Sequence, residues 1–146
     1  MSAMRLGLFL LSLLLAAPTT ESAPAPVYRE PASLETAHRA LPERLRYMID
    51  SFHRHLPESI DGWRRDMIRA RTEKDKESKR RTMEHWKAEF YRHPIDLLEY
   101  QRQQQPYQGR EDQQKIATAL KYYRLQYHEA KKKGLFTEPP GMQPLK

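Results

Sequence analysis

The chain has no cysteine and no asparagine, and its five glycines are scattered along 146 residues. Without cysteine it can form neither disulfides nor thiolate nucleophiles, and without asparagine it cannot carry N-linked sugars. The scattered glycines leave no phosphate-binding loop, and no serine stands in a G-x-S-x-G elbow. These absences exclude several common catalytic designs, so we predict a protein that is not an enzyme and uses no cofactor.

Long hydrophobic runs are also missing, apart from one near the N-terminus. The apolar stretch from Leu6 to Ala17 is interrupted only by Ser12. This stretch is shorter than the roughly 20 residues that a helix needs to cross a bilayer. Because Arg5 precedes it and small residues follow it, residues 1–23 have the layout of a cleavable secretory signal.

We therefore predict a secreted protein or one in the lumen of the secretory pathway, with no stable membrane anchoring after cleavage. An uncleaved anchor and an organelle presequence are the alternatives. The lack of acidic residues before Glu21 favours a presequence, whereas the single arginine of this segment argues against one. The alternative localisation is thus mitochondrial.

Charged residues make up 31% of the chain and hydrophobic residues 38%, and the net charge is +7. This balance is typical of a helix-rich chain with a modest core, and the length suits one small domain. We predict an all-α fold, either a small three- to four-helix bundle or a helical hairpin. An extended Pro-rich linker with a short helical turn (24–41) precedes the helical domain (42–134), and a mobile C-terminal tail (135–146) follows it.

Apolar residues recur at helical spacing through most of this domain. A turn capped by Ser33 is predicted up to residue 40, and helices are predicted over 42–56, 59–93, 94–104 and 110–134. Pro57 and Pro94 are expected to end the first two helices. In the second helix the apolar stripe lapses and resumes out of phase, so this helix either breaks near Ser78 or packs on different elements at its two ends. Gly134 is expected to cap the last helix in a left-handed conformation.

Large apolar and aromatic side chains mark a candidate partner face. Tyrosine and tryptophan are enriched at protein interfaces because they bury area while keeping a polar end. On the last helix, this stripe either forms such a face or packs on the 42–56 helix. The candidate residues are Trp63, Trp86, Ile116, Leu120, Tyr123 and Tyr127.

Lysine and arginine are in excess in two regions. Residues 59–93 contain eleven of them against seven acidic residues, and residues 110–134 contain seven against three. This charge gives nucleic-acid binding only weak support, because the cations of the first region point around the helix with acids between them. The candidate basic surface comprises Arg64, Arg65, Arg80, Arg81, Lys131, Lys132 and Lys133.

Histidine and glutamate raise the question of a metal site. His85, Glu89 and His93 are spaced four apart and would share one face of a helix. A structural zinc site usually needs four ligands, and no nearby residue completes the set, so we predict none.

These observations predict a small exported helical protein that acts by binding a protein partner and presents a basic surface. The alternative is a helical subunit or assembly factor of a large organellar complex, such as a mitochondrial ribonucleoprotein or a respiratory assembly. The fate of the N-terminal segment discriminates between these hypotheses, because secretory cleavage near residue 23 supports only the first.

Overall fold

The computed structural model describes residues 28–145, so the predicted signal at residues 1–23 lies outside the described residues. Four helices and no strand form within residues 28–145, which confirms the predicted all-α fold. The helices are α2 (Leu34–Ala40), α3 (Glu43–Arg69), α4 (Glu73–Gln101) and α5 (Arg110–Lys132).

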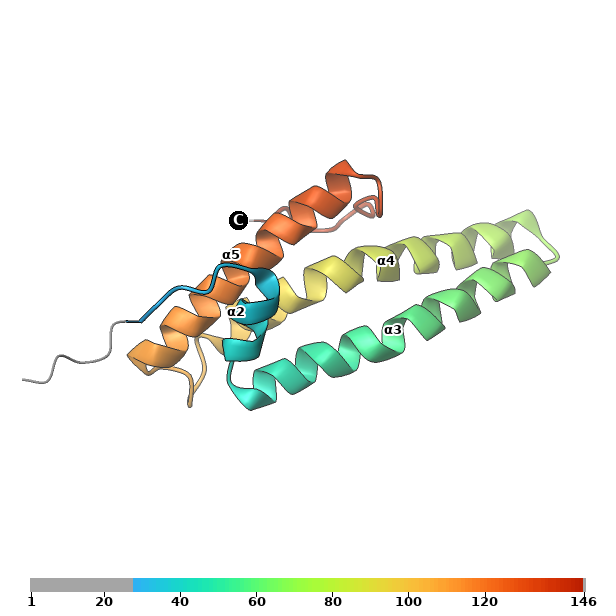
Figure 1. Ribbon diagram of the computed structural model, residues 1–146. Coiled ribbons are helices and arrows are strands. Elements are labelled where there is room, and N and C mark those ends of the chain that lie inside the picture. Colours follow the sequence, from blue (N-terminus) through green and yellow to red (C-terminus); the bar gives the residue numbers. More distant parts are fainter. Residues whose placement is uncertain (1–27, 146) are drawn as a thin grey trace, which may run out of the picture.

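The two longest helices, α3 and α4, form an antiparallel hairpin (Figure 1). α5 packs on α4 and α2 packs on α5, so this end of the molecule is the thicker one (Figure 1). The other end of the hairpin extends past α5 as an arm of only two helices. The predicted short turn is confirmed as α2, which Ser33 and Thr36 cap reciprocally through side chain and backbone.

Both prolines that were expected to end helices lie inside them. α3 continues through Pro57 and α4 through Pro94, and the chain turns at residues 70–72 rather than near Ser78. The predicted helix ends at these prolines are therefore wrong. At the turn itself, the side chain of Thr72 accepts a hydrogen bond from the backbone N–H of Asp75 and so caps α4.

The reason that α4 continues through Pro94 is a contact from the neighbouring helix. A proline has no N–H, so the carbonyl four residues before it, that of Phe90, loses its helical partner. His53 of α3 donates from Nε2 to this carbonyl at 2.8 Å. Hairpin formation thus satisfies the group that the proline leaves without a bond.

The core lies where α2, α4 and α5 meet the first half of α3. Its buried side chains include Leu45, Ile49, Ile95, Leu98, Ile116, Leu120 and Tyr127. All of the buried residues of α3 lie before residue 57, so the distal part of this helix contributes little to the core.

Residues 135–145, for which the sequence predicts a mobile tail, return toward the helices, where Phe136, Met142 and Leu145 pack on the core. Gly134 adopts a positive φ of 74°, and Leu135 donates its N–H to the carbonyl of Ala130, which confirms the predicted glycine cap. The reversal places Phe136 against Tyr91 and Tyr127, where only 2% of its surface is exposed. Burial of this aromatic ring holds the segment in place.

Candidate interaction groove

A groove of about 650 Å³ runs between α3 and α4 and is lined by these two helices alone. Its lining residues are Tyr47, Met48, Ser51, Phe52, His55, Leu56, Ser59, Trp63, Trp86 and His93. None of them is Asp, Glu, Lys or Arg, although such residues make up 31% of the chain. An uncharged, largely apolar concavity on so highly charged a protein is a candidate binding site.

The long side of the groove follows one face of α3. Tyr47, Ser51, His55, Ser59 and Trp63 all line it and are spaced four residues apart. Side chains at this spacing lie one above another along a helix. The small side chains of Ser51 and Ser59 leave room for an occupant between the aromatic residues at the two ends of this row.

Two stacks of rings join α3 to α4, and the one between Phe52 and His93 lines the groove. The rings of Phe52 and His93 stack with centroids 3.8 Å apart, and the Trp86 ring lies 6.4 Å from that of Phe52. A second stack joins His53 to Phe90 at 4.3 Å. Each helix therefore presents one histidine and one phenylalanine to its partner, and these pairs hold the two helices in register.

Burial lowers the pKa of both histidines in these stacks. For His53, burial outweighs the opposing effect of its hydrogen bond to Phe90, and for His93, burial is reinforced by the proximity of His53. Both imidazoles are therefore neutral at neutral pH, and His93, the one of the two that lines the groove, adds no charge to it.

Trp63 and Trp86, predicted from sequence as parts of a partner face, both line this groove although they lie on different helices. Lys79 of α4 sits over the ring of Trp63, 5.5 Å from its centroid. This cation–π contact covers one face of the indole and helps to hold the ring in position at the end of the groove nearest the turn at residues 70–72.

The other four residues of the predicted partner face lie in the core. Ile116, Leu120, Tyr123 and Tyr127 are all less than 5% exposed. They belong to α5, which packs on α4 and α2 rather than chiefly on the first half of α3. In this fold they stabilise the interior and offer no exposed face.

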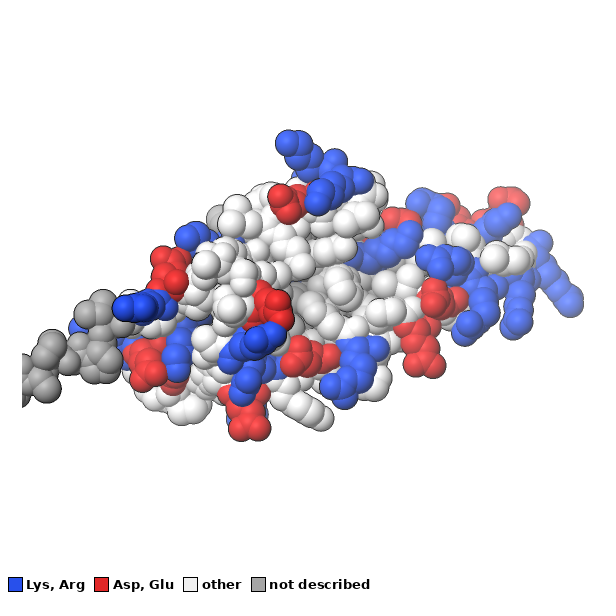
Figure 2. Space-filling view, viewed as in Figure 1, with Lys and Arg blue, Asp and Glu red and all other residues white. Residues whose placement is uncertain are grey.

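The seven residues of the predicted basic surface separate into two groups. Lys131, Lys132 and Lys133 lie at the end of α5, and the four arginines lie on the arm. Figure 2 shows the blue side chains gathered at the free end of the arm. Arg80 and Arg81 both bind Glu77, and the hydrogen bond from Arg80 is the main reason that the pKa of Glu77 falls to about 2.

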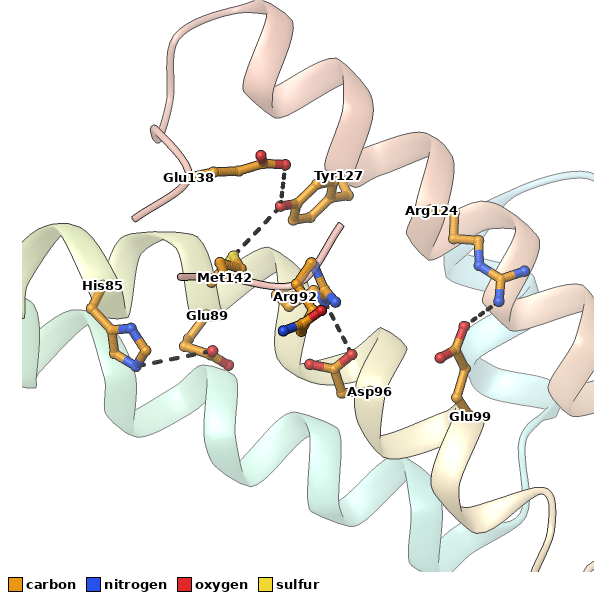
Figure 3. A network of polar contacts seen from close by, with 10 residues as sticks. His85, Glu89, Arg92, Asp96, Glu99, Arg124, Tyr127, Glu138 and Met142 are labelled. Carbon is orange, nitrogen blue, oxygen red and sulfur yellow. Dashed lines mark hydrogen bonds and ion pairs between the residues drawn. The ribbon is translucent and has the colours of Figure 1, made fainter. Parts of the chain in front are cut away.

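A polar network joins α4 to α5 and to the C-terminal segment (Figure 3). Arg92 donates to the Asp96 carboxylate at 3.0 Å and to the backbone carbonyl of Gln143 at 2.6 Å. The hydroxyl of Tyr127 donates to Glu138 at 2.8 Å, and burial raises the pKa of this tyrosine to about 12. Every bond here is made within the chain, so the network holds the C-terminal segment to the helices.

The residues of the metal hypothesis do not converge on one point. His85 lies 4.0 Å from Glu89 in the network of Figure 3, whereas His93 stacks on Phe52 in the groove. Within residues 28–145, no group of three histidine or carboxylate side chains is placed to hold a metal ion.

A Tyr–His–Asp chain connects α5, α2 and α3. Asp50 can only accept, so His38 donates to it from Nε2 at 2.8 Å and accepts from Tyr123 at Nδ1, also at 2.8 Å. Burial raises the pKa of the Tyr123 hydroxyl, which opposes any role as a nucleophile. The chain therefore ties three helices together, and its tyrosine faces none of the clefts described above.

Of the ten residues that line the groove, the sequence singled out only Trp63 and Trp86 as parts of a binding face. The signal that marks the missed residues is the uncharged row from Tyr47 to Trp63 at four-residue spacing. Which face of α3 remains uncovered depends on where α4 and α5 pack, and no local pattern contains that information.

No family model, curated protein or solved structure matches this chain. No helix within residues 28–145 is both long and apolar enough to span a membrane.

Proposed function

We propose that this protein is a non-enzymatic binding protein that holds an apolar, helical segment of a partner protein in the groove between α3 and α4. The observation that carries the proposal is the uncharged lining of this groove, with tryptophans from both helices. Two antiparallel helices with an open seam accept a third helix by burying its apolar face, which is a common mode of peptide recognition.

The composition of the groove fits this role. Tryptophan, tyrosine, phenylalanine and methionine are, with arginine, the residues enriched in protein interfaces. A helix that filled the groove would cover Met48, Phe52 and Trp86 together. Export, as predicted from residues 1–23, would place the partner in the secretory pathway or outside the cell.

Site-specific photo-crosslinking tests the proposal. A photoreactive phenylalanine derivative replaces Tyr47, which is 67% exposed at the edge of the groove, and in the control protein it replaces Leu125, which is 54% exposed on α5. We expect a partner protein to be captured from position 47 and not from position 125. The second variant, Met48→Glu, places a charge in the lining and should abolish the capture.

The purified partner then provides a direct test. The chain has only two tryptophans and both line the groove, so intrinsic fluorescence reports its occupancy. Binding should shift the emission, and Met48→Glu should weaken the affinity at least about tenfold, because a charge buried without a partner costs more than 1.4 kcal/mol. Binding that leaves the emission unchanged and survives Met48→Glu would contradict the proposal.

A further inference from the structure

The free end of the α3–α4 arm carries a concentration of positive charge that the groove does not use. Residues 61–82 contain nine Lys and Arg against five Asp and Glu. The spacing of these cations distributes them around each helix. The turn at residues 70–72 brings the end of α3 and the start of α4 together, so the cations of both helices lie at the same end of the molecule. Figure 2 shows the result as a group of blue side chains at the end of the arm.

Most of these cations have no acidic partner within residues 28–145. Arg64 pairs with Asp61, and Arg80 and Arg81 share Glu77. The other six form no ion pair there: Arg65, Arg69, Arg71, Lys74, Lys76 and Lys79. The end of the arm thus keeps a net positive charge, although Asp66 and Asp75 line the same hollow as Arg69, Arg71 and Lys79.

The end of the arm also exposes an apolar side chain. Ile68 is 73% exposed, more than any other large hydrophobic residue within residues 28–145. Arg65 and Arg69 flank it on the same turn of α3. Ile68 thus presents most of its surface to the solvent between two arginines.

We infer that the end of the arm is a peripheral docking site for a membrane surface that contains anionic lipids. Lysine and arginine attract anionic headgroups, and a short apolar side chain between them can enter the boundary of the acyl chains. The arm projects beyond α5, so its end can reach a flat surface without obstruction by the rest of the domain (Figure 1).

A nucleic acid is a less suitable partner for this end. Binding of single strands relies on aromatic side chains that stack on the bases. Trp63 is the aromatic residue nearest the turn along α3, and Lys79 already covers one face of its ring while the residue lines the groove. The isoleucine would gain nothing from a phosphate backbone, whereas a membrane would bury it.

Labelling at single cysteines tests the inference in the full chain, because the protein has no cysteine of its own. An environment-sensitive fluorophore is attached to Ile68→Cys and, as a control, to Leu125→Cys on α5. The probes are vesicles of phosphatidylcholine alone and vesicles that also contain phosphatidylserine. We expect a blue shift at position 68 with the anionic vesicles only, reversed by added salt, and no shift at position 125.

Charge reversal at the end of the arm provides a second, independent experiment. Arg65, Arg69 and Arg71 are changed together to Glu, and a matched control changes the exposed Arg44, Arg54 and Arg102, which are remote from the turn in sequence. The first variant should lower partitioning to anionic vesicles at least about tenfold, and the control should change it far less. The apolar residues 6–17 are unchanged in every variant, so any contribution that they make to vesicle partitioning is the same throughout.

Several results would overturn the inference. These are no shift at position 68 on anionic vesicles, equal shifts at positions 68 and 125, or equal losses from the two charge-reversed variants. A fluorescence change at position 68 with a short RNA, but not with vesicles, would assign the site to nucleic acid instead. Because neither variant alters the groove, failure here leaves the proposed function unaffected.

Discussion

At the scale of single residues, the most informative side chains are the two histidines between α3 and α4. His53 has the carbonyl of Phe90, His38 and Asp50 around it, and His93 has Phe52, His53 and Asp96. Each histidine packs its neutral ring on a phenylalanine. Protonation would therefore place a charge in a half-buried contact, where the loss of its hydration is unfavourable.

The pH dependence of stability follows from the lowered pKa values of His53 and His93. Because each pKa falls below its ordinary value of 6.5 on folding, the unfolded chain binds more protons as the medium is acidified. The free energy of unfolding should thus fall as the pH drops below about 6.5. Urea denaturation between about pH 7.5 and about pH 5.5 measures this fall.

The variant His53→Gln/His93→Phe should flatten this pH dependence, since glutamine can still donate to the Phe90 carbonyl and phenylalanine can still stack. The control His128→Gln removes an exposed histidine of α5 and should leave the slope unchanged. Burial raises the pKa of Glu89, which gives an effect of opposite sign in the parent protein and in the variants alike. An unchanged slope in the double variant would contradict the assignment.

At the scale of elements, the hairpin explains why Pro94 does not end α4. The carbonyl released by Pro94 is bound by His53 across the hairpin, so the continuity of α4 depends on α3. In isolation, α4 would be expected to break at the proline. It continues in the hairpin because α3 supplies the N–H donor that the proline lacks. The ends of α3 and α4 at residues 70–72 are instead set by the Thr72 cap and the reversal of the chain.

A double-mutant cycle between His53→Phe and Pro94→Ala tests this dependence. His53→Phe alone leaves the Phe90 carbonyl without a partner and should cost about 1–3 kcal/mol of stability. In the Pro94→Ala background the new N–H binds that carbonyl, so the same change should cost about 1 kcal/mol less. His55→Phe, on the same helix but with no side-chain bond to α4, should show additive effects with Pro94→Ala. Additivity for His53 as well would exclude the proposed coupling.

At the scale of the whole molecule, the fold divides into a thick base and a thin arm. The base contains α2, α5, the C-terminal segment and the parts of α3 and α4 that they cover, whereas the distal arm has only two helices in contact. Local opening is easier where fewer apolar contacts hold the backbone. The groove spans both regions, so its distal side is the more easily displaced.

Amide hydrogen exchange measures this difference directly. We expect residues 60–80 to exchange orders of magnitude faster than residues 116–130, which are in the buried helix α5. Filling of the groove by a partner should slow exchange on both sides of the arm. Equal protection of arm and base in the isolated protein would contradict the division.

The sequence by itself determined the features that depend on near neighbours along the chain. These are the helical class, the Ser33 cap, the last helix and the glycine that ends it, since periodicity and capping act over a few residues. The tertiary structure decided the continuity through Pro94, the packing of Phe136, the burial of Tyr123 and Tyr127, and the meeting of Trp63 with Trp86 in one groove. Each of these depends on groups far apart in sequence, whose contacts form only when the hairpin closes and α5 packs on it.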